Sequence, residues 1–93
     1  MEVRLDGIDT PESRRVDAKC IKELRLGLIA KAWMKDKLPI GSRVTLVWSG
    51  VREKFGRLLA TVVFNGENIN SSLIRKGYAA EYHGATKGNW CKA

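Results

Sequence analysis

The chain has one histidine and two cysteines among its 93 residues. A four-ligand zinc site cannot be built from so few imidazole and thiol groups within one chain. No apolar run approaches the length needed to span a bilayer, and no basic helix has a clean apolar face opposite its lysines. Zinc modules and membrane proteins are therefore excluded, and we expect no membrane partner.

Low-complexity tracts and internal repeats are also missing, and 44% of the residues are hydrophobic. This composition argues against disorder, and the length allows a single domain with one modest core. The chain does not open with a charged leader, an apolar segment and a small-residue cleavage site in order. Targeting signals therefore do not indicate where the protein works.

Positive charge is what the chain has in excess. Lysine and arginine outnumber aspartate and glutamate by 17 to 10, and the isoelectric point is about 9.8. Such a chain attracts polyanions, of which nucleic acid is the obvious candidate.

Hydrophobic periodicity and turn residues divide the chain into short elements. They predict a strand at 2–9, a polar loop at 10–17, a helix at 18–38, strands at 43–49 and 57–64, a helix at 68–76 and an irregular tail from residue 80. The turn pair Asn65-Gly66 ends the third strand, and Gly77 is the expected cap of the second helix.

The long predicted helix carries two apolar rows. The stronger row, expected to be buried, consists of Cys20, Ile21, Leu24, Leu28, Ala32 and Leu38. The lesser row consists of Leu26, Ala30 and Trp33, and we expect the tail with Trp90 or another chain to cover it.

The stretch "VRLDGIDTPE" at 3–12 places an arginine within a strand and two carboxylates around a proline. Pro11 restricts the backbone of the turn, so Asp9 and Glu12 lose little conformational entropy when they bind a ligand. Fixed acids beside Arg4 suit a divalent cation held against a phosphate. The alternative is that Asp9 and Glu12 only cap the next element.

A second stretch, "REKFGRLL" at 52–59, places a glycine between an aromatic residue and an arginine. Gly56 marks a tight loop that delivers Arg57 to the start of a strand, where the sheet fixes the side chain. Arg57 is thus a second positioned guanidinium.

Together, "VRLDGIDTPE" and "EKFGR" resemble the two motifs of the staphylococcal nuclease (thermonuclease-like) family, and "NINSSLIRKGYA" resembles its next helix. The resemblance covers residues 3 to about 82. It implies an α+β fold built on an OB-fold-like barrel of the staphylococcal nuclease type. It also implies calcium-dependent hydrolysis of DNA or RNA phosphodiesters by water, leaving 3′-phosphate ends.

The resemblance also implies roles for individual residues. Asp9 corresponds to a carboxylate ligand of one catalytic calcium ion, and the carbonyl oxygen of Thr10 to another ligand. Glu12 corresponds to the general base, or to the group that orients the attacking water. Arg4 and Arg57 correspond to the two arginines that hold the scissile phosphate.

Around this centre, further residues are candidates for binding nucleic acid. Lys54 either contacts a phosphate or is merely solvated. Phe55 stands where the family often has tyrosine, which keeps base stacking and loses a hydroxyl contact. Tyr82 falls near the family's aromatic nucleotide contacts, whereas His83 is expected to be an unimportant surface residue. The outer basic candidates, which are either contacts or ordinary solvated charges, are Arg14, Arg15, Lys87 and Lys92.

The sequence departs from the family pattern at one important point. The family's "Asp-Gly-Asp-Thr" hairpin is not found, so two of five barrel strands and one metal carboxylate are expected to be absent; Asp6 or Asp17 could substitute as a ligand. We therefore expect weak calcium binding and a homo-oligomer formed through the uncovered barrel edge. The alternative function is a catalytically impaired OB-like nucleic-acid-binding or interaction module.

Cys20 and Cys91 are expected to lie close together, because the tail has little else to anchor it. Whether they form a disulfide is left open by the sequence. Oxidation would suit the secreted or periplasmic location that the family resemblance favours.

Overall fold

The computed structural model describes residues 3–83 and 88–92. Its elements are β1 (Val3–Leu5), β2 (Ile8–Asp9), α1 (Ile21–Lys37), β3 (Thr45–Arg52), β4 (Leu58–Phe64), β5 (Glu67–Asn68), α2 (Ile69–Arg75) and β6 (Ala80–Glu81). Lys87, one of the outer basic candidates, lies outside the described residues.

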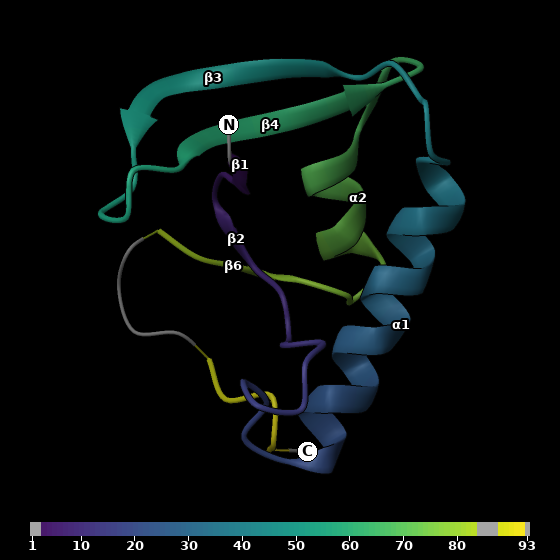
Figure 1. The fold of residues 1–93 in the computed structure, drawn as a ribbon, viewed down its shortest axis with the longest axis vertical. Coiled ribbons are helices and arrows are strands. Elements are labelled where there is room, and N and C mark those ends of the chain that lie inside the picture. Colours follow the sequence, from purple (N-terminus) through teal and green to yellow (C-terminus); the bar gives the residue numbers. More distant parts are fainter. Residues whose placement is uncertain (1–2, 84–87, 93) are drawn as a thin grey trace.

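The sheet is centred on β4. Strand β4 pairs in parallel with β1 and antiparallel with β3 and β5, while β2 and β6 form a separate antiparallel pair (Figure 1). The fold is therefore mixed α+β. Among the described residues, these pairings do not close a barrel.

Several predicted elements are confirmed, with corrected ends. The predicted first strand is two strands, because Asp6 and Gly7 form a turn in which Gly7 has a φ of +75°. The Asn65-Gly66 pair has positive φ at both residues and joins β4 to β5, as a tight hairpin turn requires. The C-cap of α2 is Lys76 rather than the predicted Gly77, which comes next and has the positive φ of +77° that commonly ends a helix.

The predicted tail is not wholly irregular. Its first residues form β6, in which Ala80 pairs with Asp9 and Glu81 with Ile8. A two-residue strand has no periodicity that a sequence pattern could reveal, which is why this pairing was not predicted.

The core lies between α2, β4 and β2. Its buried members are Ile8, Val62, Ile69, Leu73 and Ala79. The long helix α1 adds Trp33 and Met34 to the margin of this cluster (Figure 1).

The predicted buried face of α1 is wrong. Ile21 and Leu28 are 55% and 49% exposed, whereas Ala30 is buried and Trp33 packs 6.0 Å from Tyr78 between ring centroids. The lesser apolar row therefore faces the core, and Trp33 packs there against Tyr78 of the same chain. Helix α1 is oriented by a close backbone contact at Gly27, which apolar periodicity does not encode.

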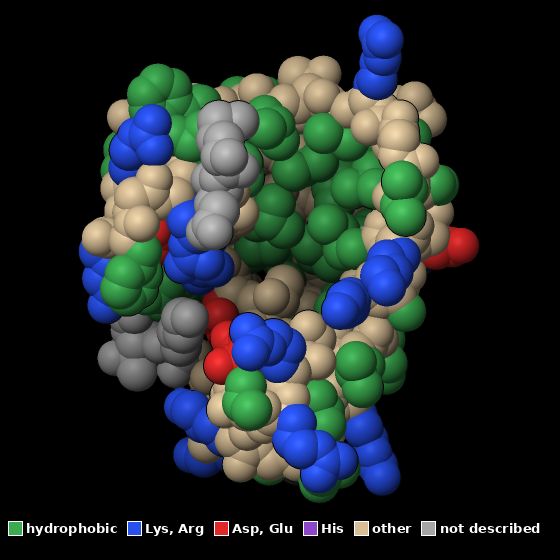
Figure 2. Space-filling model, viewed as in Figure 1, with side chains coloured by type: hydrophobic (Ala, Val, Ile, Leu, Met, Phe, Trp, Pro, Cys, Tyr) green, Lys and Arg blue, Asp and Glu red, His purple; other side chains and the backbone are tan. Residues whose placement is uncertain are grey.

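β3 is confirmed as a strand, but all of its residues are exposed. Its large side chains include Val47, Trp48 and Val51, each more than half exposed. Figure 2 shows hydrophobic side chains gathered in the hollowed middle of one face, with lysine and arginine side chains around them.

Neither described helix combines the length and apolar character needed to cross a membrane.

Candidate active site

Two arginines that lie far apart in the sequence line one cavity of about 660 Å³. Arg4 comes from β1, and its register partner in the sheet is Leu59 of β4. Arg57 directly precedes β4, at the end of a turn in which Gly56 has a φ of +86°. Parallel pairing of β1 with β4 thus brings both guanidinium groups to the same end of the sheet.

Both arginines are held by neighbouring groups. Arg4 donates a 3.3 Å hydrogen bond from Nη2 to the carbonyl oxygen of Ile8, and its guanidinium carbon lies 5.6 Å from the ring centre of Tyr82. Arg57 pairs with Glu53 at 3.1 Å between Nη2 and Oε2. The positive charges are therefore fixed in direction before any ligand binds.

Glu53 is a site residue that the sequence interpretation missed. Its Oε1 accepts the backbone N–H groups of Phe55 and Arg57, both at 2.9 Å, so the same carboxylate shapes the turn and holds the guanidinium. The hydrogen bond from the Arg57 side chain is the main cause that lowers the pKa of Glu53. The sequence signal that could have identified Glu53 is its position, four residues before the predicted phosphate-binding residue Arg57.

The three predicted nucleic-acid-binding residues line the same cavity. Phe55 is 74% exposed at the β3–β4 turn, Lys54 lies 5.1 Å from its ring centre, and Tyr82 follows β6. Exposed aromatic rings beside cations are suited to stacking on bases along a phosphate backbone. His83 also lines this cavity, as does Asp6.

The predicted carboxylates line a second, smaller cavity of about 140 Å³. Asp9, Thr10 and Glu12 contribute to it together with Asp17, Lys19, Glu23 and Trp90. The candidate site therefore consists of two cavities: a cationic cavity, which contains the two arginines, and an acidic cavity, which contains the carboxylates. The two are neighbours, because Ile8 lines the first and Asp9, the next residue of β2, lines the second.

Asp9 is buried, with 6% of its surface exposed. Its Oδ2 accepts a 3.1 Å hydrogen bond from the indole N–H of Trp90. Trp90 was predicted only to cover apolar surface, and no local sequence pattern could show that it reaches a residue 81 positions away.

The donor set around Asp9 offers few protein oxygens grouped for a calcium ion. Within residues 3–83 and 88–92, no three histidine, cysteine, aspartate or glutamate side chains are grouped to hold a metal. Of the substitutes considered, Asp6 lines the other cavity, whereas Asp17 lines the same cavity as Asp9 and pairs with Arg14 at 3.5 Å. Calcium usually takes six to eight oxygen ligands, so Asp9 and the Thr10 carbonyl are too few.

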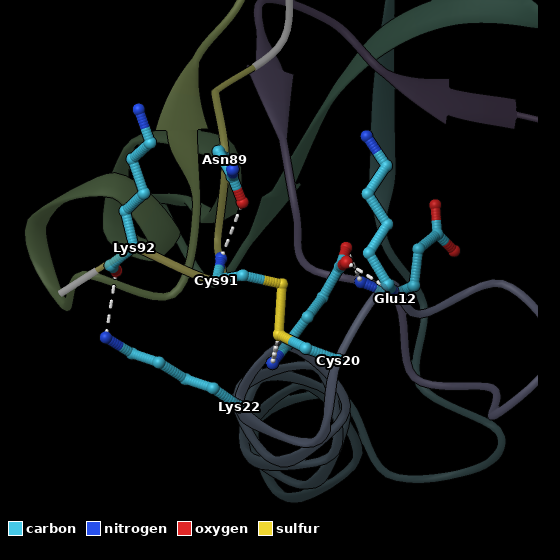
Figure 3. The surroundings of a disulfide bond; sticks show 8 residues. Glu12, Cys20, Lys22, Asn89, Cys91 and Lys92 are labelled. Carbon is cyan, nitrogen blue, oxygen red and sulfur yellow. Dashed lines mark hydrogen bonds between the residues drawn. A yellow bond between two sulfur atoms is a disulfide. The ribbon is translucent and has the colours of Figure 1, made fainter.

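A disulfide joins Cys20 to Cys91, the pair expected to lie close, and each cysteine directly follows a residue that lines the acidic cavity, Lys19 and Trp90 (Figure 3). Cys20 is the N-cap of α1, and Cys91 follows Trp90. The disulfide therefore anchors the segment that carries Trp90, the hydrogen-bond donor to Asp9.

Comparison with known proteins shows the family of the chain. The family model of staphylococcal nuclease homologues matches residues 2–91, and the chain belongs to this family. It is 33% identical over 85 residues to Endonuclease YhcR of Bacillus subtilis, covering 87% of this chain and 7% of that protein. It is 44% identical over 78 residues to an uncharacterized protein of Bacillus anthracis, covering 82% of this chain and 35% of that protein. The chain thus spans a small part of the first relative and about a third of the second.

Proposed function

We propose that this chain is a nuclease domain that hydrolyses phosphodiester bonds of DNA or RNA. The observation that carries the proposal is the joint placement of Arg4 and Arg57 in one cavity with Lys54, Phe55 and Tyr82. Two fixed guanidinium groups can hold a phosphodiester and stabilise the added charge of a five-coordinate phosphorus. Membership of a family of nuclease homologues and a relative named as an endonuclease support the same activity.

In the proposed reaction, the scissile phosphate lies where the two cavities meet along β2. A water molecule attacks phosphorus, and Glu12, exposed at the acidic cavity, accepts its proton or orients it. The bond from phosphorus to the 5′ oxygen breaks, the leaving oxygen takes up a proton, and a 3′-phosphate remains. Arg4 and Arg57 offset the negative charge during this step.

The test compares cleavage of single-stranded DNA, duplex DNA and RNA by the protein and two variants. Replacing one preorganised electrostatic donor usually costs about 10² to 10³ in rate, so Arg57→Ala should lower kcat by that factor. Arg43→Ala is the matched control, because Arg43 is exposed and does not line either cavity. Equal activity of the two variants would contradict the assigned role of Arg57.

We propose that calcium binds this chain weakly, through Asp9 and the carbonyl oxygen of Thr10. The small donor set and the hydrogen bond from Trp90 to Asp9 support weak binding. Calorimetric titration with calcium should give a dissociation constant above about 10⁻⁴ M, typical of sites with few charged ligands. Micromolar binding would show that the donor set is more complete than proposed.

The alternative function is a catalytically impaired nucleic-acid-binding or interaction module with an OB-like fold. It is supported by the separation of the arginines from Asp9 and Glu12 into two cavities. Such a module would bind oligonucleotides with a steep salt dependence and would not cleave them.

We propose that β3 is covered in the functional protein, either by completion of an OB-like barrel or by a second copy of the chain. The support is its wholly exposed apolar surface, at the edge of the sheet order β1–β4–β3. A secreted or periplasmic location is also proposed, because the disulfide suits an oxidising compartment.

A further inference from the structure

The backbone of Glu12 is hydrogen-bonded to a buried glutamate of α1. Glu23 is 6% exposed, and its Oε2 accepts the backbone N–H of Glu12 at 3.1 Å. Its Oε1 accepts the backbone N–H of Lys19 at 2.9 Å. One carboxylate therefore fixes the loop of residues 12–19 at both of its ends.

A second contact lies one helical turn further along α1. A β-carbon built on Gly27 would lie 2.1 Å from the carbonyl oxygen of Glu12 and 2.8 Å from the backbone nitrogen of Ser13. Side-chain atoms cannot approach backbone so closely, so only glycine permits this packing. Because residues four apart lie on one face of a helix, Glu23 and Gly27 contact the loop together. We call this pair the α1 clamp.

Helix capping alone does not account for the α1 clamp. Cys20 is the N-cap and its sulfur accepts the backbone N–H of Glu23, while the Glu23 side chain accepts the backbone N–H of Lys19, the residue before the N-cap. The bond from Glu12 to Glu23 is additional, and it joins the helix to a loop 11 residues earlier. Close packing at Gly27 has no capping role.

The result is a fixed backbone that carries an exposed side chain. Figure 3 shows the Glu12 side chain directed away from the disulfide, while its backbone faces the end of α1. Pro11, which is buried, restrains the preceding residue. The Glu12 carboxylate can then move only about its own side-chain torsions, which confines it near the acidic cavity.

We propose that Glu23 and Gly27 are positioning residues for Glu12. They hold the carboxylate where it can act on the attacking water, and neither touches the substrate. The inference rests on the proposed hydrolysis, because it concerns how Glu12 is presented for that reaction. A misplacement of about 1 Å can lower a rate by about 10².

The kinetic test uses Glu23→Gln and Gly27→Ala. Glutamine keeps one acceptor oxygen, so one of the two backbone N–H bonds is lost, and the alanine methyl group displaces the Glu12 backbone. Both should lower kcat by about tenfold to a hundredfold and leave KM within about twofold. Asp36→Asn, which changes an exposed acid on the same helix, should leave both constants unchanged. Alanine forms helix better than glycine, so a loss in Gly27→Ala is not due to a weaker helix.

A second measurement is independent of catalysis. Amide hydrogen exchange followed by NMR should be slow at Glu12 in the unaltered protein and in Asp36→Asn, and faster in Glu23→Gln. If the unaltered protein cleaves no better than Glu12→Gln, the proposed function fails, and a slow Glu12 amide still supports the α1 clamp. Fast exchange at Glu12 in the unaltered protein would overturn the clamp. Faster exchange in folded, active Glu23→Gln with an unchanged kcat would overturn its positioning role.

Discussion

Reduction of the bond between Cys20 and Cys91 should destabilise this domain severely. The two cysteines are 71 positions apart, so the bond closes most of the chain into one loop. The chain-entropy relation assigns about 4 kcal/mol to a loop of that length at 25 °C. A domain of this size usually has about 5 to 14 kcal/mol of total stability, so the bond supplies a large fraction.

The assay is urea unfolding of the oxidised and reduced protein, with thiols first counted in denatured, unreduced samples. We expect no free thiol before reduction, and afterwards a loss of about 4 kcal/mol with little change in the folded far-UV spectrum. Cys20→Ser is the matched variant, because a serine hydroxyl can still cap α1. It should resemble the reduced protein.

Two results would refute this reasoning. Two reactive thiols in the denatured, unreduced protein would show that the bond does not form. An unchanged urea midpoint after complete reduction would show that the unfolded chain is not expanded by losing the bond, contrary to the loop-closure argument.

Three further outcomes are expected. Because folding lowers the pKa of Glu53, its pair with Arg57 stabilises the fold fully above the ordinary glutamate pKa, and this stabilisation is lost as pH falls through the lowered pKa of the folded state. Glu53→Gln should abolish this part of the pH dependence of the unfolding free energy. Trp90→Phe removes a donor to the buried Asp9 carboxylate and should lower the free energy of unfolding by about 1 to 3 kcal/mol in urea titrations, whereas no change would disprove the bond. Val47→Lys on exposed β3 should convert a proposed homo-oligomer to monomer in sedimentation velocity, and a protein already monomeric at high concentration would reject that proposal.

The residues of the cationic half could be picked out from the sequence because each of its motifs is short and continuous. Arg57 is placed by Gly56 in a short turn, and Arg4 by a strand whose neighbour is β4. Each motif fixes only its own turn or strand end, and the parallel pairing of β1 with β4 brings the two motifs together. The structure places Arg4, Arg57 and Phe55 in one cavity.

The acidic half depends on contacts between residues far apart in the sequence. Trp90 reaches Asp9 only because a disulfide and β6 bring the tail back, and Glu23 reaches Glu12 across an intervening loop. The orientation of α1 follows from the close approach at Gly27, which outweighs the stronger apolar row. Neither periodicity nor spacing carries such information, so the buried face of α1 was predicted wrongly.

The spacing between the two cavities is set by β2 and its partner β6. This pair has only two register positions, Ile8 with Glu81 and Asp9 with Ala80. So short a ladder cannot fix its own register, and a slip of one residue would turn Asp9 toward the other face. The core fixes one end of β6 through Ala79, and the disulfide retains the tail beyond its other end. Reduction should therefore loosen the alignment of arginines and carboxylates as well as the fold, so catalysis should decline at lower urea concentrations than global unfolding.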